Sequence, residues 1–133
     1  MVLVDTNVLL DIATQDAVWF EWSSGQLASL INTREAAINP VIYAELAPLY
    51  RNARELDLNL VPPSDFRRLT LPFSAGFPAA RAFQAYRKSG GQRTAPLPDF
   101  FIGAHAEAEG LVLLTRDAAR YRTYFPKVKL ICP

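Results

Sequence analysis

The sequence predicts a single α/β domain, covering residues 1–133, in which a parallel sheet carries helices on both faces. Short apolar runs alternate along the chain with longer stretches of helical character. This alternation is typical of a parallel sheet whose strands are buried on both sides. The length of 133 residues fits one domain, and half of the residues are hydrophobic. A chain of this size buries roughly two thirds of its unfolded surface, so it forms a core without disulfides.

The first half of the chain contains the clearest strand and helix signals. The strand at 1–4 is an unbroken apolar run that ends at Asp5, as expected for a buried parallel strand. Asn39 and Pro40 mark a helix start, since Asn accepts hydrogen bonds from unpaired N–H groups and Pro suits the first helical position. Pro48 should bend this helix or end it early. The expected elements of residues 1–66 are strands at 1–4 and 36–38 and helices at 17–32 and 40–49.

Glycines divide the second half. Gly90 and Gly91 end one helix and Gly110 closes the next, because glycine readily adopts the left-handed conformation that follows many helices. Residues 52–66 show no clear pattern, and Pro62 and Pro63 interrupt whatever precedes them. The expected elements of residues 67–133 are strands at 68–71, 111–114 and 128–131 and helices at 74–89, 99–109 and 118–124.

Three acidic residues follow predicted strands or begin the helices after them, and a fourth lies inside a helix. Asp5 follows the first strand directly, and Asp117 follows the strand at 111–114 after two intervening residues. Asp99 begins the helix at 99–109. Glu45 lies about one and a half turns into its helix, in a stretch nearly without charge. Ligands bind beyond the carboxyl ends of parallel strands, so we expect these carboxylates to gather at one edge of the sheet.

Each acid also has a purely structural interpretation. Asp99 and Asp117 are candidates for helix N-caps, Asp5 for the cap of a short helix after it, and Glu45 for a solvated helix residue. Carboxylates that pack together repel one another, however, and persist mainly where a cation neutralises them. Ligands that are all oxygen suit Mg²⁺ or Mn²⁺. Such ions activate water for an in-line displacement at phosphorus, which makes phosphodiester hydrolysis the favoured interpretation.

Other chemistries lack their residues. The single cysteine, Cys132, rules out an internal disulfide and a cysteine zinc site, and the single histidine, His105, rules out catalysis by two imidazoles. We expect His105 to be structural or to lie in an interface. Neither a glycine-rich phosphate loop nor a nucleophile-elbow serine occurs. With no basic signal-peptide start and no apolar run long enough to span a bilayer, we expect a reduced, cytoplasmic protein.

The net charge of +1 hides an asymmetry between the two halves of the chain. Residues 1–66 carry three Arg and nine acids, for −6, whereas residues 67–133 carry eleven Lys and Arg and four acids, for +7. Either the two halves interleave in space and the imbalance disappears, or an acidic pocket is rimmed by basic side chains. The second arrangement would suit a metal ion and a phosphate polymer.

Four segments of the sequence closely resemble the PIN domain, and within it the VapC-type toxins of prokaryotic toxin–antitoxin pairs. Any one of these segments alone would be a weak signal, but four in the same order span essentially the whole chain. They are Val4-Asp-Thr-Asn-Val-Leu-Leu10, Asn39-Pro-Val-Ile-Tyr-Ala-Glu-Leu46, Leu97-Pro-Asp-Phe-Phe-Ile-Gly-Ala104 and Leu113-Leu-Thr-Arg-Asp117.

The resemblance implies a three-layer αβα sandwich with a central parallel sheet and the activity of a Mg²⁺- or Mn²⁺-dependent endoribonuclease. Thr6 and Asn7 match the polar stretch after the first acid, and Thr115 matches a hydroxyl position that supports the site. A homodimer and a cognate antitoxin protein that blocks the site are also implied. The residues that match the four metal-binding acids of the family are Asp5, Glu45, Asp99 and Asp117.

Two arginines adjoin the acids in the sequence and are candidates for binding RNA phosphates, namely Arg93 and Arg116. Arg93 could equally be a solvated loop residue, and Arg116 could pair internally with a site carboxylate. Two rival functions differ in class. One is a catalytically silent PIN-fold module that binds RNA or protein. The other is a receiver-like or phosphatase-like domain, which ranks last because no lysine lies at a predicted strand end near the acids.

Overall fold

The computed structural model describes residues 1–90 and 97–133, and it contains a five-stranded, wholly parallel sheet with the strand order β3-β2-β1-β4-β5. The strands are β1 Val2–Val4, β2 Ala36–Ile38, β3 Arg67–Arg68, β4 Val112–Leu114 and β5 Leu130–Ile131. The α-helices of the described residues are α1 Thr6–Ala13, α2 Phe20–Asn32, α3 Pro40–Leu46, α4 Ala53–Asn59, α5 Gly76–Lys88, α6 Leu97–Glu109 and α7 Ala118–Tyr124.

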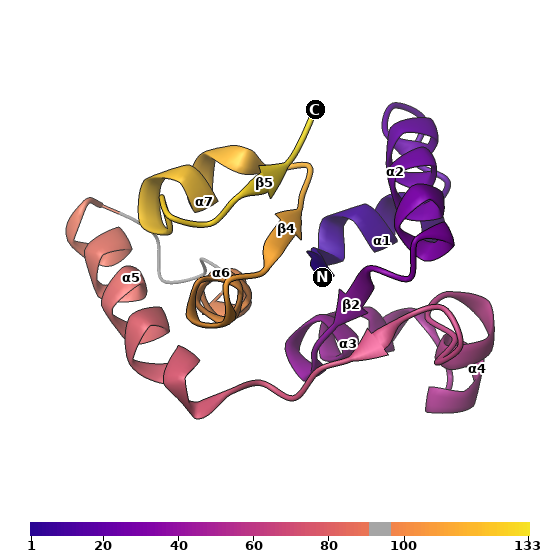
Figure 1. The fold of residues 1–133 in the computed structure, drawn as a ribbon, viewed down its shortest axis with the longest axis horizontal. Coiled ribbons are helices and arrows are strands. Elements are labelled where there is room, and N and C mark those ends of the chain that lie inside the picture. The colour runs from indigo at the N-terminus through magenta and orange to yellow at the C-terminus, as the bar shows by residue number, and fades with distance from the viewer. Residues whose placement is uncertain (91–96) are drawn as a thin grey trace.

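Helices cover both faces of this sheet. Figure 1 shows α1 and α2 on one side of the central strands and α5 and α6 on the other. Apolar strand residues fill the space between these layers, and Leu3 of β1 and Leu113 of β4 are fully buried. Leu9 of α1 and Phe100 of α6 belong to the same core. The expected three-layer αβα sandwich with a central parallel sheet is therefore confirmed.

Most predicted elements occur at the expected positions, with differences at their ends. The helix predicted over 17–32 begins at Phe20, because the Asp16 side chain accepts hydrogen bonds from the backbone N–H groups of Val18 and Trp19 and holds a turn there. The α6 helix begins two residues before Asp99. After α3 the chain continues as a short 3₁₀ helix, Ala47–Leu49, that contains Pro48.

In the middle of the chain, one predicted strand differs from the structure and one helix was not predicted. The strand expected over 68–71 shortens to Arg67–Arg68 and lies at the exposed edge of the sheet. Residues 52–66, which gave no pattern, contain α4. Asn52 caps this helix by accepting a hydrogen bond from the N–H of Glu55. Only Leu56 of α4 is buried, so the helix lacks the regular apolar stripe that would reveal it in the sequence.

Two glycines, Gly103 inside α6 and Gly110 just after it, each have a structural reason. A Cβ atom at Gly103 would lie 2.4 Å from the ring of Phe125, so only glycine allows this close approach. Gly110 closes the helix with a φ of +64°, the left-handed conformation expected for it. None of the helices in the described ranges is long and apolar enough to cross a membrane.

The order of the strands reverses direction at one point in the sheet, between β1 and β4. The chain builds β1, β2 and β3 in one direction, then returns to add β4 on the other side of β1. The carboxyl ends of β1 and β4 therefore lie side by side, with Val4 opposite Leu114. In open parallel sheets, this reversal of strand order is where the loops diverge and ligands bind. Asp5 and Thr115 directly follow these two strands.

Candidate active site

Asp5 lies at this reversal point and is held by four hydrogen bonds. The carboxylate is almost completely buried. Its Oδ1 accepts a 2.8 Å bond from the N–H of Thr6, which makes Asp5 the N-cap of α1. Its Oδ2 accepts bonds from the hydroxyl groups of Thr115 at 2.8 Å and Tyr121 at 3.0 Å. A longer bond of 3.3 Å comes from the amide of Asn7. Oδ1 therefore retains an acceptor position.

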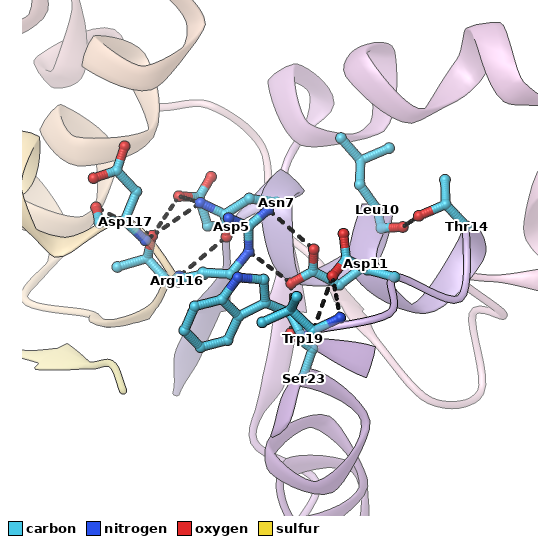
Figure 2. A network of polar contacts seen from close by, with 12 residues as sticks. Asp5, Asn7, Leu10, Asp11, Thr14, Trp19, Ser23, Arg116 and Asp117 are labelled. Atoms are coloured by element: carbon cyan, nitrogen blue, oxygen red, sulfur yellow. Dashed lines mark hydrogen bonds and ion pairs between the residues drawn. The ribbon is translucent and has the colours of Figure 1, made fainter. Parts of the chain in front are cut away.

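The residues expected to support the site join α1 to the loop between β4 and α7. The Asn7 amide donates to the hydroxyl oxygen of Thr115 at 3.3 Å, and its Oδ1 accepts from the backbone N–H of Arg116 at 3.1 Å. The hydroxyl oxygen of Thr115 also accepts from the N–H of Asp117 at 3.1 Å. Figure 2 shows Asn7 next to Asp5, with Arg116 and Asp117 on the neighbouring loop.

Glu45 approaches the same region from α3. Asn39 caps this helix by accepting from the N–H of Ile42, as the sequence predicts. Glu45 lies one and a half turns further on, where its Oε1 accepts a 2.6 Å bond from the hydroxyl of Thr6. Burial raises the pKa of Glu45, and the charge of Asp99 raises it further. Glu45 is therefore a half-buried side chain that is hydrogen-bonded to α1, not a solvated helix residue.

Asp99 lies in the first turn of α6, so its interpretation as a cap at the helix start was wrong. Its Oδ2 accepts a 2.5 Å bond from Arg120, whose guanidinium lies over the rings of Tyr86 and Phe100. Burial raises the pKa of Asp99 and the Arg120 charge opposes this shift, while Asp117 adds a repulsive charge.

Asp117 occupies the N-cap position of α7, but its side chain makes no capping hydrogen bond. Among the residues that the structure describes, no donor contacts its carboxylate. The structural interpretation of this acid as a cap is therefore wrong as well. Its position, two residues after Thr115, leaves the carboxylate available to a ligand.

The four carboxylates come from four separate segments and are close enough to affect one another's ionisation. Burial raises the pKa of Asp5 to about 7, and the charge of Asp99 contributes to this shift. Asp99 also raises the pKa of Glu45 and is itself affected by Asp117. Because a like charge disfavours ionisation, a cation bound among these groups would relieve the repulsion.

The donor set fits a hard divalent cation. All its atoms are carboxylate, hydroxyl or amide oxygens, which suit Mg²⁺ or Mn²⁺, and Oδ1 of Asp5 and the Asp117 carboxylate keep acceptor positions. Within residues 1–90 and 97–133, however, no three His, Cys, Asp or Glu side chains are grouped closely enough to hold a metal ion as they stand. Metal binding would therefore need side-chain movement. Asp99 is paired with Arg120, so it would have to exchange this arginine for the metal ion.

The structure describes only one of the two arginines that the sequence suggests for RNA phosphate binding. Arg93 lies outside the described residues. The guanidinium of Arg116 forms two hydrogen bonds with Asp11 of α1, at 2.9 and 3.0 Å. Arg116 thus pairs internally, but not with a site carboxylate as the alternative had it, because Asp11 is not one of the four acids. RNA binding by either arginine stays a prediction.

Sequence reasoning missed three residues that contact the proposed site residues. Tyr121 donates to Asp5, Arg120 pairs with Asp99, and Asp11 pairs with Arg116. One signal was present in the sequence: Arg120 and Tyr121 lie three and four residues after Asp117, about one helical turn, and therefore on the same face of α7.

His105 has the structural role expected of it. The ring is fully buried and its Nδ1 lies 2.9 Å from the side-chain nitrogen of Asn39. Asn39 Oδ1 accepts from the N–H of Ile42, so its amide group donates to Nδ1 and the ring proton belongs on Nε2. Nε2 lies 3.7 Å from Glu109. His105 thus joins α6 to the start of α3, the helix that carries Glu45.

Solved structures share this fold. The VapBC2 complex of Rickettsia felis, bound to a DNA fragment from its promoter, matches with a TM-score of 0.72 and 18% identity, over 100% of this chain and 99% of that chain. FitAcB of Neisseria gonorrhoeae matches with a TM-score of 0.69 and 22% identity, over 98% and 96%. A toxin–antitoxin complex of Klebsiella pneumoniae matches with a TM-score of 0.67 and 22% identity, over 96% and 95%.

A search among proteins of curated function found no match. The sequence itself matches the PIN domain family over residues 2–126, nearly its whole length. All four segments that suggested this resemblance lie within the match. Together with the parallel sheet and the carboxylates at its reversal point, this shows that the chain belongs to the PIN domain family.

Proposed function

We propose that the protein is a metal-dependent endoribonuclease that hydrolyses phosphodiester bonds in RNA and acts as the toxin of a type II toxin–antitoxin pair. The observation that carries this proposal is that four carboxylates, which follow β1, lie in α3 and α6 and follow β4, are close enough to affect one another's ionisation. Membership of the PIN domain family supports a nuclease.

Each acid has a proposed role as a metal ligand. Asp5, Glu45, Asp99 and Asp117 would hold Mg²⁺ or Mn²⁺, directly or through water. The bound ion would supply a water of lowered pKa and stabilise negative charge at phosphorus. The chain's own contribution is orientation. Thr115 and Asn7 donate to Oδ2 of Asp5, so Oδ1 keeps an acceptor position beside its bond from the Thr6 N–H, and the Thr6 hydroxyl donates to Glu45.

The proposed partners are an RNA substrate, a cognate antitoxin and a second copy of the chain. Two of the similar structures are described as toxin–antitoxin or VapBC complexes, which supports an antitoxin partner. Arg93 remains a candidate for RNA phosphates. The alternative function is a silent PIN-fold module that binds RNA or protein, and cleavage distinguishes the two.

The test is RNA cleavage by the purified protein with Mg²⁺ or Mn²⁺, and again with excess chelator. We expect cleavage only with the metal, and products with a 5′-phosphate and a 3′-hydroxyl, because water rather than the ribose 2′-hydroxyl attacks phosphorus. The D117N variant should be inactive, whereas E21Q, which changes an exposed acid of α2, should cleave normally. Products with a 2′,3′-cyclic phosphate, or equal activity in D117N, would contradict the proposal. RNA binding without cleavage would favour the silent module.

A further inference from the structure

An ion pair between a half-buried arginine and a buried aspartate adjoins the candidate site. The guanidinium of Arg116 donates through Nε and Nη2 to the two carboxylate oxygens of Asp11, at 2.9 and 3.0 Å. Asp11 is only 2% exposed, and its Oδ2 also accepts a 2.7 Å bond from the hydroxyl of Ser23. The guanidinium lies 5.5 Å from the ring centroid of Trp19. Figure 2 shows Arg116 reaching across from the Asp117 loop to Asp11.

The position of this pair in the chain links it to the acids. Arg116 stands between Thr115, which donates to Asp5, and Asp117. Its backbone N–H is bound by Asn7, so both its main chain and its side chain are attached to α1. Asp11 belongs to α1, the helix that Asp5 caps. The side chain of Arg116 therefore connects the loop after β4 to the helix after β1.

We propose that Asp11 and Arg116 are positioning residues, whose ion pair fixes the loop at 115–117 and so holds Thr115 and Asp117 in place for metal binding. This inference rests on the proposed function. A guanidinium fork bound to both oxygens of a carboxylate has a defined orientation as well as a charge. Residues that hold metal ligands from behind commonly change metal affinity or activity by about 10- to 100-fold when they are replaced.

Two other roles for the pair would have different consequences. If Arg116 gripped RNA, D11N would release its guanidinium and leave or improve RNA binding. If only charge mattered, D11N would weaken cation binding by adding a net positive charge, whereas R116Q would strengthen it. A positioning role predicts that both variants weaken binding. It also predicts that the double variant is no weaker than either single one, since the residues act as a unit.

The experiment measures Mn²⁺ binding by electron paramagnetic resonance, without RNA, below the melting temperature of every variant. We expect D11N and R116Q each to weaken Mn²⁺ affinity by about tenfold or more. The double variant should bind Mn²⁺ as weakly as either single variant. The affinity of R116K should lie between those of wild type and R116Q. Circular dichroism should show the same helix content in each.

Two control variants separate positioning from general loss of stability. R51Q breaks an exposed two-bond pair with Glu55 on α4, and V61A removes methyl groups from the core just after α4. Both should bind Mn²⁺ as wild type does, although V61A melts at a lower temperature. Because the Arg116 side chain is 32% exposed, its replacement should disturb folding less than replacement of Asp11. If D11N does not fold, R116Q and R116K still test the proposal.

Wild-type affinity in D11N and R116Q, opposite shifts in the two, or a double variant that multiplies their effects would each overturn the positioning role. Weaker RNA binding in chelator by R116Q alone would instead make Arg116 a substrate residue. A wild-type protein that binds no Mn²⁺ would overturn the metal site of the proposed function together with this inference.

Discussion

Asp5 and Asp117 follow neighbouring parallel strands, yet their surroundings are opposite. Asp5 is buried and accepts hydrogen bonds from a backbone N–H and three side chains. Asp117 lies at the start of α7 and, among the described residues, its carboxylate accepts none. The carboxylate after β1 is thus held by protein donors, whereas the carboxylate after β4 has no such donor within residues 1–90 and 97–133.

The difference separates the parts of the site that the fold positions from the parts that a ligand would complete. Burial of Asp5 without a cation is costly, as its pKa of about 7 indicates, and four donors only partly offset that cost. Asp117 lies beside the same group of acids without such support. We infer that Asp5 anchors the site, whereas Asp117 and Asp99 adjust when a cation binds.

The largest effects should come from exchanging each carboxylate for its amide. D5N and D117N should both reduce cleavage by more than about a hundredfold, since residues that only support a ligand already change metal sites by 10- to 100-fold. Their stabilities should differ. D5N removes a buried charge but also turns an amide NH₂ toward a donor, so it should change the free energy of unfolding by about 1–3 kcal/mol, whereas D117N should change it by less than about 0.5 kcal/mol. Cleavage assays and thermal melts without metal test this. Equal melting temperatures would contradict the contrast.

The second prediction concerns the hydroxyl of Thr115 behind Asp5. T115V keeps the side-chain shape but removes the donor to Oδ2, so Mn²⁺ affinity should fall by about tenfold. T115S restores the donor and should recover most of that affinity. A loss that serine fails to restore would mean that Thr115 acts through packing.

A smaller effect, of the opposite sign, is expected from Arg120. Its guanidinium forms an ion pair with Asp99 and would repel an approaching cation. R120Q should therefore raise Mn²⁺ affinity by about fivefold, or roughly 1 kcal/mol. The metal-free protein should melt slightly lower, because Asp99 loses its partner. Weaker Mn²⁺ binding in R120Q would show that Arg120 supports the site instead of competing for Asp99.

The smallest effect should come from His105, which joins α6 to the start of α3 through Asn39 instead of contacting one of the four acids. Burial lowers the pKa of His105, with Glu109 opposing the shift, so the native state resists protonation. Below the unfolded pKa near 6.5 the unfolded chain takes up the proton more readily, and stability falls by up to about 1.4 kcal/mol per pH unit until the native pKa is reached. Melts of wild type and H105Q between pH 7 and 5 test this. The difference between them should shrink as the pH falls, with cleavage at pH 7.5 little changed; a constant difference would contradict it.

The predictable part of the molecule is the part encoded locally. The apolar run before Asp5, the Asn39-Pro40 helix start and Gly110 each carry their own signal, and the order of strands and helices then brings the acids to one edge. The four acids and the αβα sandwich follow from such signals together with the family resemblance. The α4 helix does not, because one buried leucine leaves no periodic pattern.

Contacts between distant residues could not be predicted in the same way. Asp11 and Arg116 lie 105 positions apart, and Tyr121 lies 116 positions from Asp5. Each looks like an ordinary helix or loop residue until the sheet brings β1 and β4 together. The support of the site is therefore a property of the tertiary structure, whereas the identity of its acids is visible in the sequence.

Anomalous diffraction from crystals grown with saturating Mn²⁺ tests the metal site most directly. We expect a manganese peak in contact with Asp5 and with at least one of Asp99 and Asp117, at the carboxyl ends of β1 and β4. Under the same conditions D117N crystals should show a weaker peak or none. A wild-type structure whose acids contact no manganese, or in which manganese binds only carboxylates elsewhere, would contradict the central claim that these four acids form a metal-dependent nuclease site.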